Sequence, residues 1–145
     1  VTALLHPSRK RVAQDAPVAP GWDLLLKDAP LTLRQKHHLR IYGPGIAEVL
    51  ALGSEPLCDH AGAVMGEVRY VARMEAVQSL ADILMRRTGI SWSACRGLCC
   101  AEAAAEIAGQ ELGWGPADRE RELRAFAAEL DFHLPTVQSL DAGKA

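Results

Sequence analysis

Residues 63–88 read AVMGEVRYVARMEAVQSLADILMRRT and form a long stretch with apolar residues at helical spacing. One apolar set comprises Val68, Val71, Ala72, Ala76, Leu80, Ile83 and Leu84. A second set comprises Tyr70, Met74, Val77, Ala81 and Met85. A helix with two apolar faces packs against neighbours on more than one side. The stretch therefore predicts a central helix from Ala63 to Thr88, with Gly89 as its C-cap.

Charged residues interrupt the apolar faces of this predicted helix. Asp82 and Arg86 are four residues apart and can pair along the surface. Arg87 lies among apolar positions, so its guanidinium must be paired or must reach solvent. Glu67 and Glu75 are embedded in the same way. Such charges usually hold helices or domains in register, and an anion-binding site is the alternative interpretation.

Two shorter helices are expected before the central one. The first runs from about Thr32, an acceptable N-cap, to Tyr42. The segment Gly43-Pro44-Gly45 ends it and begins the second, because glycine caps a helix and proline suits a first turn. The second helix places four residues on one side, namely Ile46, Val49, Leu50 and Gly53.

Two helices are expected after the central one. An alanine-rich helix spans about Cys99 to Leu112, and Gly113-Trp114-Gly115-Pro116 ends it and starts the next. The last helix runs from Ala117 to about Leu130 and buries Leu123, Phe126, Ala127 and Leu130.

Composition and proline placement agree with a helical protein. The 145 residues include 24 Ala and 19 Leu, whereas aromatic residues make up 5%; strands favour aromatic and β-branched residues. We expect an all-α fold, an orthogonal or irregular bundle of about five helices with an irregular N-terminal strap. Repeated prolines predict an irregular segment at 1–30, followed by a helical domain at 31–132 and a frayed tail at 133–145.

Charge and hydropathy exclude several classes of protein. A net charge of -2 argues against a nucleic-acid binder or a binder of anionic membranes. No apolar run approaches the roughly 18 residues of a membrane span, and the N-terminus lacks the order of a signal peptide. Four cysteines in a chain of this length do not suggest a disulfide framework, which indicates a cytoplasmic setting.

The candidate metal ligands are Cys58, His60, Cys95, Cys99 and Cys100. No pair of short C-x-x-C units is present, and reduced cysteines are often buried as small apolar residues, so no metal site is predicted. A metal- or redox-responsive protein remains an alternative.

Other short motifs carry little chemistry. His37 and His38 are adjacent and point in different directions on a helix, so we expect one exposed and one partly packed side chain. Corner geometry explains Gly43-Pro44-Gly45 better than a phosphate loop does, and Arg9-Lys10-Arg11 is interpreted as solvated linker charge.

Several motifs together resemble the C-terminal helical domain of FAD-dependent (aerobic) glycerol-3-phosphate dehydrogenase. The family shows a Tyr, then a Glu, then Asp-x-Leu-x-Arg-Arg-Thr on one helix, which matches Tyr70, Glu75 and residues 82–88. The preceding helices and the following segment are also similar. Their motifs are His38-Leu39-Arg40-Ile41-Tyr42-Gly43, Glu48-Val49-Leu50, Ala105-Glu106-Ile107, Glu111-Leu112-Gly113-Trp114 and the Pro-Gly signature Val18-Ala19-Pro20-Gly21.

The resemblance implies a parent enzyme that oxidises sn-glycerol 3-phosphate to dihydroxyacetone phosphate and passes electrons through FAD to quinone. In that family the flavin, substrate and catalytic residues belong to a separate flavin domain, so none of those sites is assigned here. The segment 1–30 would then lead in from that flavin domain. FAD belongs to the parent, which the resemblance would place peripherally on the inner face of the membrane.

The partner implied by the resemblance is the flavin domain of the same enzyme, and a homo-oligomer is compatible with it. The residues expected to support this packing are Glu67, Tyr70, Glu75, Asp82, Arg86 and Arg87. The alternative is a stand-alone helical interaction or regulatory module without enzymatic activity.

Overall fold

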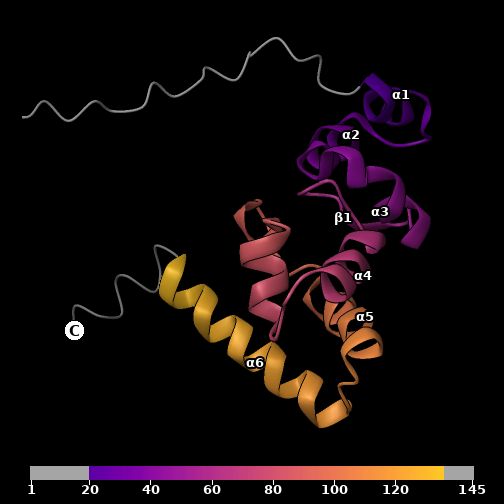
Figure 1. The fold of residues 1–145 in the computed structure, drawn as a ribbon. Helices are drawn as coiled ribbons and strands as arrows, with labels where there is room; N and C mark the ends of the chain where they lie inside the picture. Colours follow the sequence, from indigo (N-terminus) through magenta and orange to yellow (C-terminus); the bar gives the residue numbers. More distant parts are fainter. Residues whose placement is uncertain (1–19, 136–145) are drawn as a thin grey trace, which may run out of the picture.

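The computed structural model describes residues 20–135, which form a helical domain with one very short hairpin (Figure 1). The basic run Arg9-Lys10-Arg11 and the expected tail beyond residue 135 lie outside the described residues. Within 20–135 there are six α-helices and three short 3-10 or π segments. The all-α expectation is therefore confirmed.

The N-terminal third of the described chain folds as consecutive short helices. These are α1 (Pro20–Asp28), α2 (Leu33–Leu39), the 3-10 segment η1 (Arg40–Gly45) and α3 (Ile46–Leu52). Thr32 caps α2 as expected, because its hydroxyl accepts the Gln35 N–H at 3.2 Å. Gly43 has a φ of 50° inside η1 and turns the chain toward α3.

The expectation of an irregular strap is wrong for residues 20–28, which form α1. Proline restricts the residue before it but is well suited to the first turn of a helix, where Pro20 lies. Leu26 of α1 is buried against Leu39, Ile46 and Val49. Helix α1 is therefore part of the packed domain.

A two-stranded antiparallel hairpin precedes the central helix. Strand β1 (Pro56–Cys58) pairs with β2 (Ala63–Val64), which leads directly into α4 (Met65–Met74). Helices α3 and α4 approach closely at Gly66, whose N–H donates to the Gly53 carbonyl at 2.8 Å.

The expectation of one continuous helix from Ala63 to Thr88 is also wrong. Helix α4 ends at Met74, Glu75 is extended, and a new helical segment ends in the π-helix η2 (Asp82–Arg87). The break has a local cause: Ser79 and Asp82 form a capping box. The Ser79 Oγ accepts the Asp82 N–H at 3.0 Å, and the Asp82 carboxylate accepts the Ser79 N–H at 3.2 Å.

The C-terminal part matches expectation more closely. The C-cap of η2 is Thr88, and Gly89 follows it in the left-handed conformation as the N-cap of the 3-10 segment η3 (Ile90–Trp92). Helix α5 (Ala101–Leu112) ends at the left-handed Gly113, and α6 (Pro116–His133) begins with Pro116. Of the expected buried face of α6, Phe126 and Leu130 are buried and Ala127 is exposed.

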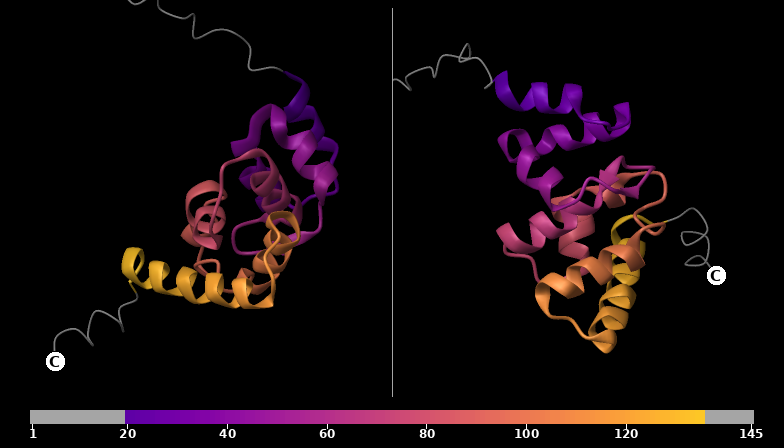
Figure 2. Two further views of the ribbon diagram at one scale, coloured as in Figure 1. Left: turned by 60° about the horizontal axis from the view of Figure 1, so that its bottom comes forward. Right: turned by 90° about the vertical axis from the view of Figure 1, so that its right-hand side faces the viewer.

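The apolar side chains of the described domain form two clusters. A small cluster near the N-terminus comprises Leu26, Leu39, Ile46, Val49 and Val64. A larger one joins α4, η2, α5 and α6 and includes Val68, Leu84, Ala104 and Phe126. Helix α1 and helix α6 lie at opposite ends of the molecule (Figure 2).

Candidate functional site

The most buried charged residue of the described chain is Glu67, in the first turn of α4. Its side chain is 0% exposed. One carboxylate oxygen, Oε1, lies 2.8 Å from His38 Nε2 and accepts the Tyr42 hydroxyl at 2.9 Å. The other, Oε2, accepts the Val64 N–H at 2.7 Å. Glu67 thus joins α2, η1 and β2 to α4.

Tyr42 and Tyr70 complete this polar cluster. Burial and the neighbouring Glu67 carboxylate raise the pKa of Tyr42 above its usual range, so its hydroxyl stays a proton donor. The two rings meet edge to face, with centroids 5.6 Å apart. The arrangement satisfies the hydrogen-bonding capacity of a buried carboxylate.

The remaining charged candidates pair around the second helical segment. The Arg86 guanidinium donates to Asp82 at 3.2 Å and to Glu129 of α6 at 2.7 Å. Arg87 lies 3.1 Å from Glu75, so its guanidinium is paired at the surface.

Asp82 also carries the capping interactions described above. Its partial burial alone would raise the pKa of the carboxyl. Hydrogen bonds from the Gln78 and Ser79 N–H groups and from Ser79 Oγ, together with the Arg86 charge, outweigh burial and hold that pKa below its usual range.

Four of the five candidate metal ligands come together in the structure. Cys58 Sγ lies 3.5 Å from both Cys95 Sγ and Cys99 Sγ, and the latter two sulfurs are 3.0 Å apart. His60 Nδ1 lies 3.7 Å from Cys99 Sγ. We call Cys58, His60, Cys95 and Cys99 the thiol–imidazole cluster; its four ligand atoms all lie within 4.8 Å of one another.

The fifth candidate, Cys100, is buried and its thiol donates to the Gly97 carbonyl. Within the cluster, burial opposes ionisation of Cys95, but hydrogen bonds from Ser93, Cys99 and Cys58 lower its pKa to about 6. Burial and the hydrogen bonds to Cys95 and Cys58 raise the pKa of Cys99 to about 12.

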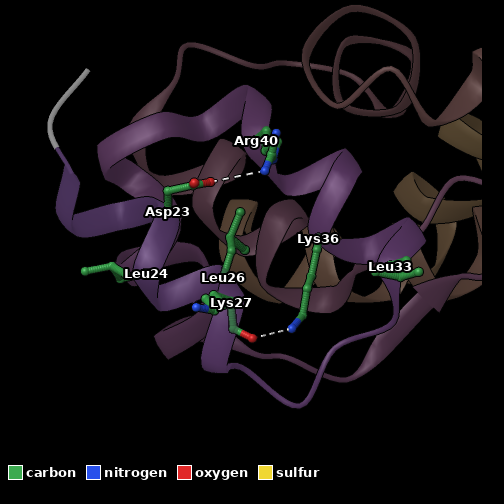
Figure 3. Close-up of a pocket in the computed structure, with 7 residues that line it drawn as sticks. All are labelled: Asp23, Leu24, Leu26, Lys27, Leu33, Lys36 and Arg40. Carbon is green, nitrogen blue, oxygen red and sulfur yellow. Dashed lines mark hydrogen bonds and ion pairs between the residues drawn. The ribbon is translucent and has the colours of Figure 1, made fainter. Parts of the chain in front are cut away.

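A shallow hollow of about 380 Å³ opens between α1 and α2 (Figure 3). The Lys36 ammonium donates to the Lys27 carbonyl across it, and Arg40 pairs with Asp23 at 3.2 Å. Leu24 points outward from α1 at its edge. No role was predicted for this surface, because its α1 side was expected to be irregular and its α2 side was predicted only as part of a helix.

None of the helices between residues 20 and 135 has the length and apolar character that a membrane-spanning segment requires.

Comparison with known proteins shows the family to which the chain belongs. The family model for the C-terminal domain of alpha-glycerophosphate oxidase matches residues 22–119. The chain belongs to this family. The matched range of this chain runs from α1 into the first turn of α6 and contains the residues of both the Glu67 cluster and the thiol–imidazole cluster.

Curated relatives carry related names. Glycerol-3-phosphate dehydrogenase from Mycobacterium leprae is 34% identical over 105 residues, which cover 68% of this chain and 18% of the relative. Glycerol-3-phosphate dehydrogenase 2 from Mycobacterium bovis is 35% identical over the same shares. The chain thus spans less than a fifth of the length of these relatives. No solved structure matches the chain.

The comparisons confirm the resemblance drawn from the sequence motifs. The structure also adds residues that the sequence did not single out. His38 lies 29 positions before Glu67, and Tyr42 lies 25 positions before it. The sequence signals were the family motif that runs from His38 to Gly43 and the pair of adjacent histidines, of which His37 is exposed and His38 partly buried, as expected.

Proposed function

We propose that this chain is the non-catalytic C-terminal domain of a FAD-dependent glycerol-3-phosphate dehydrogenase. The parent reaction is oxidation of sn-glycerol 3-phosphate to dihydroxyacetone phosphate, with electrons passing through FAD to quinone. The match of residues 22–119 to the C-terminal domain family carries the proposal. The relatives named glycerol-3-phosphate dehydrogenase support the reaction assigned to the parent.

The described residues do not fit a flavin site, so the reacting atoms are assigned to another part of the parent. Dinucleotide cofactors usually bind where a glycine-rich turn joins a parallel strand to a helix. Within residues 20–135 the strands are β1 and β2, which form an antiparallel hairpin. No step of the reaction is assigned to residues of this chain.

The surface that we propose for docking on the flavin domain is the α1–α2 face, defined by Leu24, Leu25, Lys27, Leu33 and Lys36. Leu24 is 58% exposed and Leu33 is 87% exposed, so two large apolar side chains face solvent beside the hollow of Figure 3. Helix α1 is the first described element, and in the resembled family the chain enters this domain from the flavin domain. A partner with an apolar patch and carboxylates would complement the leucines and lysines.

The charged candidates act inside the domain in this proposal. Glu67 and Tyr70 join the N-terminal helices to α4, whereas Asp82, Arg86 and the Arg87–Glu75 pair fix the segment around η2. Their task is to keep the domain in the shape that presents the α1–α2 face.

A chimera tests the proposal with a readout of activity. The matching segment of the Mycobacterium leprae relative is replaced by this chain, and glycerol 3-phosphate-dependent reduction of a quinone analogue is measured. We expect a soluble, active chimera. The double variant Leu24→Asp, Leu33→Asp should lower its activity at least about tenfold through lost docking of the apolar face. Phe132→Asp is the matched control, because Phe132 is 80% exposed on α6 at the other end of the domain.

Different outcomes contradict different parts of the proposal. A stable chimera without turnover would contradict the function and favour a stand-alone interaction module. Equal activity of the double variant and of Phe132→Asp would contradict the docking face alone. The separately purified chain is expected to show no flavin absorption and no turnover, and tight FAD binding would contradict this division of labour.

A further inference from the structure

The ligand atoms of the thiol–imidazole cluster lie close enough together for one tetrahedral metal ion to bind all four, because all lie within 4.8 Å of one another. Zinc binds sulfur at about 2.3 Å and histidine nitrogen at about 2.0–2.1 Å, so a tetrahedral ion separates two ligand sulfurs by about 3.8 Å and a sulfur from a nitrogen by about 3.6 Å. The cluster shows sulfur pairs at 3.5, 3.5 and 3.0 Å and a sulfur–nitrogen pair at 3.7 Å. We propose that Cys58, His60, Cys95 and Cys99 bind one zinc ion.

The first two ligands come from the turn of the β1–β2 hairpin. Cys58 ends β1, and the Ala61 N–H donates to its sulfur at 3.4 Å. Gly62 has a φ of 78° and its N–H donates to the Cys58 carbonyl at 2.8 Å. This tight turn places His60 on the same side as the Cys58 thiol, two residues along the chain.

The other two ligands come from a second tight turn, between η3 and α5. Arg96, between Cys95 and Cys99, has a φ of 56°, which is rare for a residue with a side chain. Its guanidinium holds this conformation from outside the turn, because it donates to the carbonyls of Leu130 at 3.3 Å and Leu134 at 2.6 Å, at the end of α6. The strained conformation of this turn is therefore stabilised by contacts with the end of α6, as strained conformations at ligand-binding loops are usually stabilised by their surroundings.

The ligand types select the metal. Three thiolates and one imidazole form a soft donor set that favours zinc over magnesium or calcium. A set of four protein ligands leaves no open position, which is typical of a structural and not a catalytic ion. A binuclear iron–sulfur cluster divides its ligands between two irons, whereas these four atoms lie within 4.8 Å of one another. The four cysteines are all free thiols, so no disulfide competes for the ligands.

The ion would fasten two segments that are distant in the sequence. Cys58 and Cys95 are 37 residues apart, and the intervening chain contains α4 and η2. Zinc binding would therefore hold the β1–β2 hairpin against the start of α5 and stabilise the fold. This inference concerns the chain itself and does not depend on the proposed dehydrogenase function.

Zinc content and cobalt substitution of the purified chain test the inference. The chain is prepared under reducing conditions, loaded with zinc, dialysed and analysed for metal, sulfide and mass. We expect one zinc per chain, and the cobalt form should show the visible absorption of a tetrahedral ion with thiolate charge transfer. Removal of zinc by a chelator should lower Tm by at least about 5 °C.

Two ligand variants and two matched controls locate the site. His60→Ala and Cys99→Ser change exposed side chains, so the folded apoprotein should persist by circular dichroism while zinc affinity falls at least about a hundredfold. His37→Ala, another exposed histidine, and Cys100→Ser, the adjacent cysteine outside the cluster, should keep stoichiometric zinc. The inference would be overturned if the chain bound no stoichiometric metal, or if it contained iron with inorganic sulfide. It would also be overturned if the mass of the chain prepared under reducing conditions were lower by the two hydrogens lost in a disulfide, or if Cys100→Ser lost zinc to the same extent as the ligand variants.

Discussion

At the scale of single residues, the start of α4 depends on two neighbours with opposite requirements. Gly66 must have no side chain, because a Cβ there would collide with the Val49 carbonyl oxygen and lie 2.6 Å from that of Gly53. Glu67 must have its full side chain, because its carboxylate contacts His38 Nε2 and accepts hydrogen bonds from the Tyr42 hydroxyl and the Val64 N–H. A buried carboxylate is tolerated only when its hydrogen bonds are satisfied in this way.

Gly66→Ala should lower the free energy of unfolding by about 3 kcal/mol, because α3 and α4 would have to separate. Gly21→Ala in α1 is the matched control, since a Cβ there meets no atom within 4 Å. It should leave stability unchanged or raise it by about 0.5 kcal/mol through helix propensity. Urea denaturation measures both, and equal stabilities would refute the close approach at Gly66.

The residue scale also shows what one sequence can and cannot reveal. Glu67 was recognisable as a charge at an apolar helical position, which is a local pattern. Its partners His38 and Tyr42 were not, because their proximity depends on how α2 and η1 fold back onto α4. For the same reason Cys58 and Cys95 looked unrelated in a chain without paired C-x-x-C motifs, although both lie in one cluster.

At the scale of elements, the break between α4 and η2 comes from four adjacent residues. In the segment Ser79-Leu80-Ala81-Asp82 the first and last side chains cap each other's N–H groups. This pattern lies within an apolar periodicity that continues across the break, so periodicity alone predicted one long helix. The S-x-x-D signal was present in the sequence and would have corrected the prediction.

Asp82→Ala should lower the free energy of unfolding by about 1 kcal/mol at pH 7, because the cap and its charge are lost. The folded-state pKa of Asp82 lies below its usual value, so this contribution is present above about pH 4 and is lost as the pH falls through the folded pKa. The stability difference from the parent chain should therefore shrink in acid. Chemical denaturation at several pH values measures it.

Asp28→Ala is the control for that series, since Asp28 is an exposed carboxylate near the end of α1. It should change stability by less than about 0.5 kcal/mol at each pH. A deficit of Asp82→Ala that stayed constant down to pH 2 would contradict a charge-dependent cap.

Elements bounded by glycine or proline were predicted best. Gly89 and Gly113 both lie at the ends of helices in the left-handed conformation, and Pro116 begins α6. Their effect on the backbone is intrinsic to the residue, so it needs no tertiary context. Helix α1 was missed because the nearby prolines signal both loops and helix starts, and only its packing through Leu26 distinguishes the two.

At the scale of the whole molecule, the domain is built around two apolar clusters of unequal size. Helices α4, α5 and α6 share the larger one with η2, while α1 enters the smaller one through Leu26. Tyr42 and Tyr70 pack against both clusters. The family assignment and helical class followed from the sequence, whereas the division into two clusters required the packing of segments far apart in the chain.

The unequal clusters imply that backbone amides exchange with deuterium in two regimes. Amides of α5, beside the fully buried Ala104 and Ala108, should be released only when the entire domain unfolds. Amides of α1 should exchange orders of magnitude sooner, because a brief detachment of that helix exposes little more than Leu26. Mass spectrometry of deuterated peptides measures the exchange rates of the two helices separately. Equal exchange rates in α1 and α5 would mean that the molecule opens as a single cooperative unit.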